Sequence, residues 1–271
     1  LNNWQCHCWV CGLRSKSLFS ILKKFKPGCE IQGFDPTHIE KKEDKDAEPE
    51  NIELPEGFIM LGDAIQSRDP DIKSCIKYLF SRGLREKDFW RLMIGTSTRG
   101  KFRRRVIFPS FDSFGDLNFF VTRAIDDSVY LKYINAKSDK KKIIFNEINI
   151  EWDKELTILE GPFDLSKSDY NSTCLLGSSL TDDSLLFSRI IANQTPVLLA
   201  LDSDMVGKSM NIAAKLSSYG CRVRILDLGE RSDVGEMSSS EFLNRKAEAE
   251  LWNDLKGLNH MIRSINSGSI I

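Results

Sequence analysis

The sequence of 271 residues lacks the features that mark several classes of protein. No apolar run approaches the roughly 18 residues of a membrane-spanning helix, so we expect no membrane partner. The first residues do not show the basic and then apolar pattern of a secretory signal. The net charge is only −1, so overall charge does not favour nucleic-acid binding. Such a function would have to depend on local basic patches.

Cysteines are too few and too unevenly placed for a disulfide-stabilised scaffold. Their number, seven, is odd, and their spacing is not dense, which is typical of proteins in a reducing compartment. Three of them, Cys6, Cys8 and Cys11, cluster near the N-terminus. The scattered ones are expected to be small core residues: Cys29, Cys75, Cys174 and Cys221.

Composition divides the chain into five segments. A charge-rich segment with three prolines and no apolar period separates the cysteine cluster from the rest, and we expect it to be a linker. A region with helical and then strand-like patterns follows. Strands and helices alternate after that, and a helical tail closes the chain. The expected segments are 1–34, 35–56, 57–154, 155–240 and 241–271.

Helical spacing is expected across residues 57–95. Asp69 or Asp71 is suited to capping the start of a helix here, and Gly83 to ending it. Residues 102–135 instead contain β-branched and aromatic runs broken by DSFGD, which predicts a β-hairpin. The helix expected before Gly83 would place four apolar residues on one face: Ile72, Ile76, Leu79 and Phe80.

From residue 155 onward, apolar strand-like runs alternate with helical ones. LTILEG, PVLLALDSD and CRVRILDLG have strand character, whereas TDDSLLFSRII and VGKSMNIAAKLSSYG have helical character. All-apolar strands that alternate with helices predict a parallel sheet covered on both faces. We therefore expect an α/β fold in this part of the chain.

Carboxylates follow the ends of these predicted strands. Glu160 follows the first strand, and Asp202 and Asp204 follow the second. The carboxyl ends of parallel strands form one edge of a sheet, so these side chains should converge there. Because like charges repel, the arrangement becomes favourable with a divalent cation, and carboxylate oxygens suit Mg²⁺ in phosphoryl chemistry.

Other acids near the same edge have a simpler explanation available. An aspartate at a strand end commonly caps the next helix or begins a turn. Asp164 and Asp227 are open to that interpretation, whereas Asp233, in RSDVGEM, is a further candidate for the acidic group.

A basic segment precedes the acidic half of the chain. Arginine binds phosphate with a planar fork, and lysine acts as a point charge, so such a surface could seat a polyanion beside the acids. The alternative is a solvated strand edge, which Lys and Arg commonly protect. The residues concerned are Lys101, Arg103, Arg104, Arg105, Arg123 and Lys132.

Cys8 and Cys11 have the Cys-x-x-Cys spacing of half a tetrahedral zinc site. No suitable second pair follows, and the adjacent Cys6 and His7 would rarely complete a site from one loop. A redox pair is the alternative, although no thioredoxin-like strand and helix accompany it.

Together, LEGPFD, LALDSDMVGKSMNIAAKL and ILDLGERSDVGEM resemble the TOPRIM domain of bacterial and phage DNA primases. The resemblance implies that Glu160, Asp202 and Asp204 are catalytic and bind Mg²⁺ or Mn²⁺. It also implies that Asp233 is a metal ligand. The family's third segment has a second acid, and the matching position in this chain is Gly235. This departure leaves only the neighbouring Glu236 to compensate.

Further segments resemble primases outside the TOPRIM domain. Three segments are similar to primase segments: RRRVIFP with the later RAI, YLKYINA, and YLFSRGLREKDFWRLMIG. In addition, HCWVCG is similar to the second half of the primase zinc ribbon. This implies Zn²⁺ on Cys8 and Cys11, with the partner ligands before Leu1 in an N-terminally truncated chain. The basic segments imply four residues that bind template and nucleotide: Arg103, Arg105, Arg123 and Lys132.

The resemblance thus implies a DNA primase, most similar to the small T-even-type phage enzymes. Such a nucleotidyltransferase makes short RNA primers on single-stranded DNA from ribonucleoside triphosphates, by Mg²⁺-dependent chemistry. The implied fold is a TOPRIM domain preceded by a mixed α+β basic subdomain and a partial zinc ribbon.

A replicative helicase is the implied partner, and the cytoplasm of a bacterium, for a bacterial or a phage protein, is the implied location. Two alternatives stay open. One is another TOPRIM enzyme, a nuclease or a topoisomerase fragment, and the other is a non-catalytic nucleic-acid-binding module.

Overall fold

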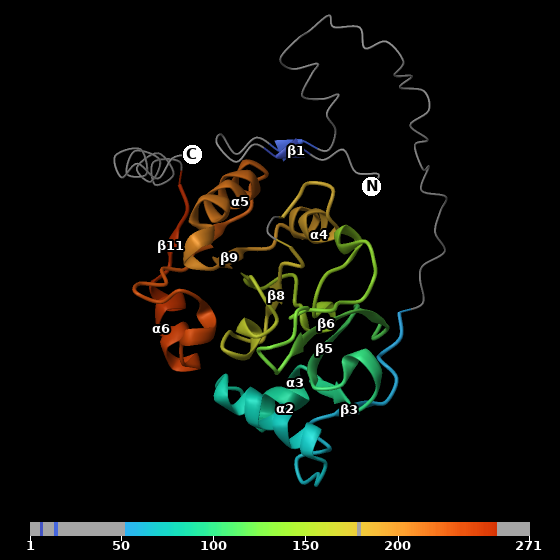
Figure 1. The fold of residues 1–271 in the computed structure, drawn as a ribbon. Coiled ribbons are helices and arrows are strands. Elements are labelled where there is room, and N and C mark those ends of the chain that lie inside the picture. Colours follow the sequence, from blue (N-terminus) through green and yellow to red (C-terminus); the bar gives the residue numbers. More distant parts are fainter. Residues whose placement is uncertain (1–5, 8–13, 16–51, 178–179, 254–271) are drawn as a thin grey trace, which may run out of the picture. The chain divides into compact units, whose positions relative to one another are not determined.

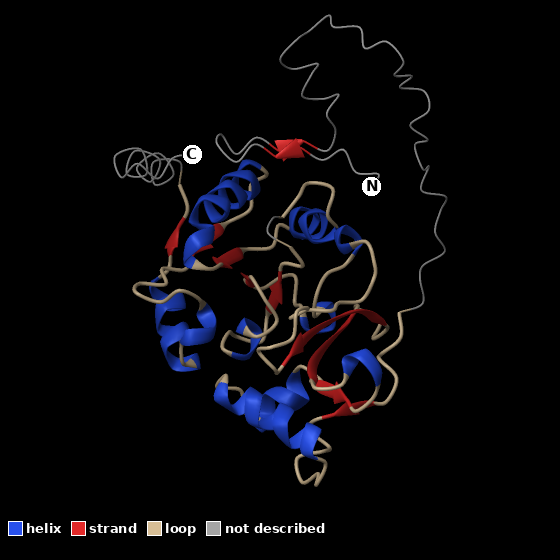
Figure 2. Cartoon of the chain, viewed as in Figure 1, coloured by secondary structure: helices blue, strands red, loops and turns tan. Residues whose placement is uncertain are grey.

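The computed structural model describes residues 6–7, 14–15, 52–177 and 180–253. The chain divides into two compact units, Leu1–Pro49 and Glu50–Ile271. In the first unit, β1 (Cys6–His7) pairs antiparallel with β2 (Arg14–Ser15). The second unit contains the two larger sheets (Figures 1 and 2).

The first of these sheets is antiparallel and contains the predicted hairpin. Its order is β3 (Phe58–Met60), β4 (Gly95–Ser97), β5 (Arg105–Phe111) and β6 (Leu117–Ala124). β5 and β6 pair from Arg105 with Ala124 to Phe111 with Leu117, which confirms the hairpin around DSFGD. The backbone of residues 132–136 continues the sheet beyond β6, through Ala124 N–H to Lys132 O at 2.8 Å and Ala136 N–H to Phe120 O at 3.0 Å.

Two strands of this sheet lie where only helix was expected. β3 lies within residues 57–95 and β4 begins at the last of them. Each strand has three residues, too few for a period of two to be visible. They are stabilised by a contact that periodicity does not reveal. The ring of Phe58 occupies the space above Gly95, where a Cβ would lie 2.1 Å from it. Gly95 therefore lets β3 approach β4.

The two helices of this region cover one face of the sheet. α2 (Pro70–Ser81) begins at Asp69, whose carboxylate accepts hydrogen bonds from the N–H groups of Asp71 at 2.8 Å and Ile72 at 3.1 Å. It ends at Ser81, and Gly83 follows the C-cap residue Arg82 with φ of +78°, which confirms both predicted boundaries. α3 (Glu86–Arg91) comes next. Phe80 is less buried than predicted, because it lies 100° around the helix from Leu79 and stacks on Phe89 near the surface.

The second sheet carries the strands that end in acids. Its order is β11 (Glu250–Leu251), β10 (Val223–Ile225), β9 (Val197–Ala200), β7 (Leu156–Leu159) and β8 (Ser172–Cys174). All neighbouring pairs are parallel except β10 with β11. The helices are α4 (Leu185–Asn193), α5 (Val206–Ser218) and α6 (Ser239–Glu248). The predicted α/β fold with flanking helices is confirmed.

Two elements of this sheet differ from the prediction. β8 was not predicted because Ser172–Cys174 has no apolar run; it is held by Thr173 Oγ1, which donates to Phe145 O at 2.6 Å. The predicted helix after residue 241 ends at Glu248, and the next residues form β11 along β10. Residues 254–271 of that tail lie outside the described part of the chain.

Six short 3₁₀ turns complete the connections in the described second unit. They are η2 (Gly100–Phe102), η3 (Lys140–Lys142), η4 (Glu147–Asn149), η5 (Asp164–Ser166), η6 (Ser203–Met205) and η7 (Val234–Glu236).

One hydrophobic cluster connects the two sheets. It includes Phe89 of α3, Phe108 of β5, Leu159 of β7, Leu198 of β9 and Phe242 of α6, all almost fully buried. Burial of each such side chain contributes roughly 1.5–3 kcal/mol. The strands that end in acids are therefore held in a fixed position relative to the antiparallel sheet.

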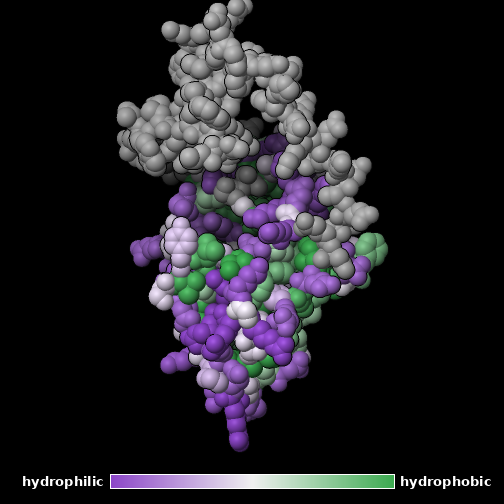
Figure 3. Space-filling model, turned by 45° about the vertical axis from the view of Figure 1, so that its right-hand side comes forward, coloured by the Kyte–Doolittle hydropathy of each residue, from purple (hydrophilic) through white to green (hydrophobic). Residues whose placement is uncertain are grey.

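The hydropathy of the surface is consistent with a core that holds the large apolar side chains. On the face drawn in Figure 3, hydrophobic residues are scattered among hydrophilic ones. Within the described residues, no helix combines the length and the apolar character that a bilayer crossing requires.

Candidate active site

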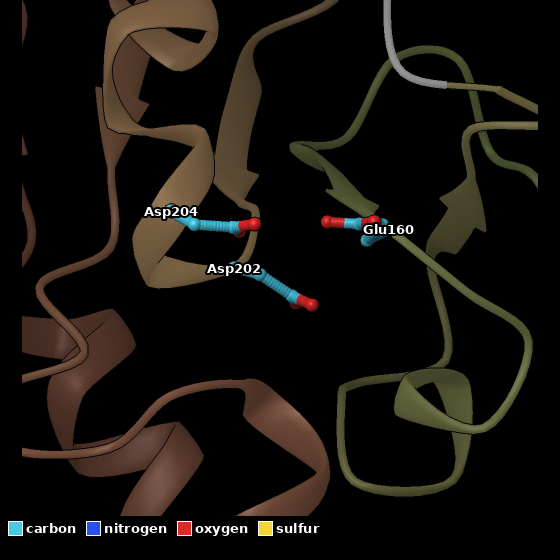
Figure 4. A group of neighbouring side chains, drawn as sticks. All are labelled: Glu160, Asp202 and Asp204. Carbon is cyan, nitrogen blue, oxygen red and sulfur yellow. The ribbon is translucent and has the colours of Figure 1, made fainter.

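Three carboxylates meet at the edge of the second sheet where β7 and β9 end. Glu160 is the residue after β7, and Asp202 is the second residue after β9. Asp204 lies in η6, which leads into α5. One oxygen from each of the three lies within 4.8 Å of the other two. In Figure 4 the carboxylates of Glu160 and Asp204 point toward each other, and that of Asp202 ends beside them.

Two oxygens of this group are buried and accept no hydrogen bond from the described residues. They are Oε2 of Glu160 and Oδ1 of Asp202. A buried polar atom without a partner costs about 1–3 kcal/mol, and more when it is charged. A divalent cation among the three carboxylates would remove that cost, and a set of hard oxygen donors fits Mg²⁺ or Mn²⁺.

Burial and the neighbouring negative charges raise the pKa values of two acids at this edge of the sheet. Burial, and then the charges of Glu160, Asp164 and Asp233, raise the pKa of Asp202 to about 7. Burial is also the main reason why the pKa of Asp164 is raised to about 6. The hydrogen bond from the Gly161 N–H to Asp164 Oδ2, at 3.0 Å, acts in the opposite direction.

Asp233 and Asp164 approach each other beside this group. Asp233 caps η7 by accepting a hydrogen bond from the Glu236 N–H at 3.0 Å. A Cβ at Gly235 would lie 3.0 Å from Oδ1 of Asp233 and 3.2 Å from Oδ1 of Asp164. A side chain at position 235 would therefore crowd both carboxylates, which is a physical reason for glycine where the primase pattern has an acid.

A cavity of about 370 Å³ is lined by both acidic and basic side chains. Four acidic residues line it, together with two arginines, a tyrosine and an asparagine. The acids are Glu160, Asp164, Asp202 and Asp233, and the other polar lining residues are Arg82, Arg123, Tyr133 and Asn135.

The pairing of β6 with residues 132–136 explains which side chains enter this cavity. Arg123 pairs with Tyr133 across the two segments, and alternate residues of a strand point to the same face. Val121 and Asn135 therefore accompany them into the cavity. The Arg123 guanidinium donates to the Tyr133 hydroxyl, and its Nε has no hydrogen-bond partner among the described residues.

Phe163 connects the acidic and the basic parts of the cavity. It lies in the same loop as Glu160 and is buried against Phe108, with ring centroids 4.7 Å apart. Its ring centre is 5.4 Å from the guanidinium carbon of Arg82 and 5.7 Å from that of Arg123. Cation–π attraction at this range holds both arginines near the carboxylates.

Arg105 has a different environment from Arg123. It pairs with Ala124, and so lies on the opposite face of the sheet, where it is 4% exposed. Its guanidinium donates to three backbone carbonyls, those of Lys101 at 3.1 Å, Lys132 at 3.0 Å and Leu131 at 2.6 Å. These bonds give Arg105 a structural role, in which it ties η2 to the segment after β6.

Arg103 is exposed and Lys132 is half-buried, and both have acidic partners. Arg103 donates to Asp71 at the start of α2, and Lys132 donates to Asp127 at 2.8 Å. Arg104, with φ of +55°, bridges Asp71 and Asp126. Part of the positive charge of the basic segment is therefore neutralised within the fold.

The remaining predicted residues fall into two groups. Cys8 and Cys11 lie outside the described residues, so the zinc half site stays a prediction. Asp227, left open between a turn and a role near the acids, accepts a hydrogen bond from the Gly229 N–H at 2.8 Å and so forms a turn.

Comparison with known proteins gives matches among solved structures alone. No family model and no curated protein matches the chain. A catalytic domain of the DnaG primase bound to single-stranded DNA is 20% identical, with a TM-score of 0.55 over 70% of this chain and 78% of that one. The zinc-binding and RNA polymerase domains of the Aquifex aeolicus primase are 20% identical, with a TM-score of 0.58 over 71% and 60%. The E. coli primase catalytic core is 20% identical, with a TM-score of 0.54 over 70% and 77%.

The chain has the fold of DnaG-type primase catalytic cores. Within this primase-type fold, the acids lie after the parallel strands and Arg123 lies on the antiparallel sheet, as described above.

Sequence reasoning missed Arg82, Tyr133 and Asn135 as cavity residues. Arg82 is the C-cap residue that follows α2, just before Gly83, and the quoted segment YLFSRGLREKDFWRLMIG contained it. The signal for the other two was the alternation in YINA, where Tyr133 and Asn135 share a face.

Replacement of Asp202 by Asn should change stability in a pH-dependent way when metal is absent. Because its pKa is raised from 3.8 to about 7, the folded protein binds the proton more tightly than the unfolded chain. The ionised carboxylate therefore destabilises the fold above pH 7, and this cost fades between about pH 7 and 4. We expect Asp202→Asn to raise the free energy of unfolding by about 1–2 kcal/mol at pH 8, after allowance for solvent screening.

Urea denaturation in EDTA at pH 8, 6 and 4 measures this difference. The exposed Asp63 is a matched control, and Asp63→Asn should change stability little at any pH. A variant of Asp202 that is no more stable than the wild type at pH 8 would contradict the assigned repulsion.

Replacement of Arg105 by Ala should destabilise the protein by about 2–4 kcal/mol, because three backbone carbonyls lose their donor in a buried site. Arg103→Ala is the control, since its side chain is 60% exposed and its ion pair should contribute about 1 kcal/mol at most. Equal urea midpoints for the two variants would refute the structural role of Arg105.

Proposed function

We propose that this protein is a DNA primase, a nucleotidyltransferase that joins ribonucleotides on a single-stranded DNA template. The observation that supports this most directly is the shared cavity, in which Glu160, Asp202 and Asp233 lie with Arg82 and Arg123. Acids that hold a cation beside guanidinium groups that bind phosphates are what phosphoryl transfer from a nucleoside triphosphate requires. The likeness to primase catalytic cores, one of them bound to single-stranded DNA, supports the same reaction.

Glu160, Asp202 and Asp204 would hold Mg²⁺ or Mn²⁺, with Asp233 as a further acid at the site. When bound, the metal would lower the pKa of the primer 3′-hydroxyl and offset the charge on the α-phosphate and the departing pyrophosphate. The 3′-hydroxyl would lose its proton to solvent, its oxygen would form the new bond to the α-phosphorus, and the bond from that phosphorus to pyrophosphate would break.

Arg82 and Arg123 would bind the triphosphate of the incoming nucleotide. Phe163 limits the movement of both guanidinium groups, so less side-chain entropy is lost when phosphate binds. Tyr133, which accepts a hydrogen bond from Arg123, would orient that arginine. Arg103 and Lys132 stay candidates for contacts with the template backbone, because both are at the surface.

Cys8 and Cys11 would contribute two thiolates to a zinc site in this proposal. The Cys-x-x-Cys spacing supports it, and so does the likeness to a primase solved with its zinc-binding domain.

Replacement of Asp202 by Asn should lower the rate of primer synthesis about 100-fold or more, because loss of a metal ligand removes several kcal/mol of transition-state stabilisation. The measurement is incorporation of labelled ribonucleotides on single-stranded DNA with Mg²⁺. Binding of single-stranded DNA should change little and serves as the control for folding.

The same assay separates the alternatives. A TOPRIM nuclease would instead cut the DNA in a metal-dependent reaction, and a non-catalytic module would bind the strand without either reaction. Unchanged primer yield from Asp202→Asn would remove the site assignment.

Arg82→Ala and Arg123→Ala should each raise the KM for ribonucleoside triphosphates about 10- to 100-fold, because each removes charged hydrogen bonds to phosphate. Lysine at either position should restore part of the loss, since it keeps the charge without the fork. Arg99→Ala is the control, because Arg99 is exposed, pairs with Glu56 and does not line the cavity. A KM equal to that of the wild type in both alanine variants would exclude them from the nucleotide site.

A further inference from the structure

We propose that Glu236 is a positioning residue that fixes the segment Asp202–Asp204 for metal binding, and that it acts through Ser232. This inference rests on the proposed metal site. In the primase resemblance, Glu236 stands next to the position of the missing acid, so its own side chain is the obvious candidate to replace that acid. The hydrogen bonds of its carboxylate assign it a different task.

Both carboxylate oxygens of Glu236 accept hydrogen bonds from the same residue, Ser232. Oε2 accepts a hydrogen bond from the Ser232 N–H at 3.1 Å, and Oε1 accepts one from the Ser232 hydroxyl at 2.8 Å. These two bonds are the first reasons why the pKa of Glu236 lies below its ordinary value, so the carboxylate stays ionised at neutral pH. Glu236 does not line the acidic cavity.

Ser232 carries the connection to the acids. Its backbone oxygen accepts a hydrogen bond from the Ser203 N–H at 2.9 Å. Ser203 stands between Asp202 and Asp204, so this bond fixes the backbone from which both carboxylates extend. Two loops that follow different strands, β9 and β10, are thereby joined at the site.

The main chain of Glu236 acts on the other side of the same loop. Its N–H donates to Oδ1 of Asp233 at 3.0 Å. One residue therefore fixes Ser232 with its side chain and Asp233 with its backbone. Because the neighbouring acids repel one another, the loops would separate without such a connection. With the connection present, the carboxylates are already positioned for the metal before it binds. Loss of a residue that positions metal ligands typically lowers metal affinity by about 10- to 100-fold.

The test is a titration of the purified protein with Mn²⁺, followed by electron paramagnetic resonance of the free ion and by the thermal shift that Mn²⁺ causes. We expect Glu236→Ala to weaken Mn²⁺ binding about tenfold. Ser232→Ala loses one of the two bonds to Glu236 and keeps the carbonyl, so a smaller loss of a few-fold is expected. Glu230→Ala is the matched control, since it removes an exposed glutamate from the same loop and should leave binding unchanged.

A double variant shows whether Glu236 acts through Ser232. If it does, Ser232→Ala should cost little further affinity once Glu236 is already Ala, whereas independent effects would multiply. The Mn²⁺ affinity of Glu236→Gln should lie between those of the wild type and of Glu236→Ala, because the amide keeps one acceptor for Ser232.

The outcomes separate this inference from the function on which it depends. Wild-type affinity in Glu236→Ala, or an equal loss in Glu230→Ala, would overturn the positioning role and leave the metal site intact. A lower melting temperature without metal, together with an unchanged dissociation constant, would also overturn it, because that is what a purely structural residue predicts. If Glu236→Ala does not fold, unchanged binding in Ser232→Ala and Glu236→Gln has the same consequence. Failure of the wild type to bind Mn²⁺ would remove the proposed metal site itself.

Discussion

The repulsion between carboxylates at the ends of β7 and β9 is the constraint to which the rest of the site responds. Asp202 and Glu160 are brought together by the register of parallel strands. Burial of Asp202, and then the charge of Glu160 and the other neighbouring acids, raise the pKa of Asp202 to about 7. Cations in the cavity wall and a divalent metal are the two ways to offset such a charge. The cavity has the first in Arg82 and Arg123. The buried oxygens of Glu160 and Asp202, which accept no hydrogen bond from the described part of the chain, fit the second.

The two sheets are one functional unit because the cluster of apolar residues between them is continuous. Phe163 shows how this works at the level of one residue. It is part of that cluster through Phe108, yet its ring lies within cation–π distance of both arginines. Packing in the core therefore sets the distance between the arginines and the acids, and a change in the core would reach the site without touching a polar residue.

The sequence revealed the acids because strand ends are written in the chain itself: an apolar run, then Glu160, and an apolar run, then Asp202. It revealed the fold of the second half for the same reason. Short strands such as β3 and β8 could not be seen, because three residues have no period and their stability comes from distant contacts such as Phe58 over Gly95. Arg82 was missed because nothing local indicates which residue of a helix end faces a loop far away in the sequence.

The basic segment shows why charge alone does not define a binding surface. Arg103, Arg104 and Arg105 are consecutive, yet one is exposed, one bridges two aspartates and one is buried under backbone carbonyls. Strand alternation and the turn before β5 decide these outcomes, and a count of positive residues does not contain them. Arg123 lines the cavity together with its register partner Tyr133, so its position in β6 decides that, of the basic residues in this sheet, it is the one that reaches the acids. The function of such a segment is therefore a property of pairing, in the same way that the acidic site is a property of parallel strands ending together.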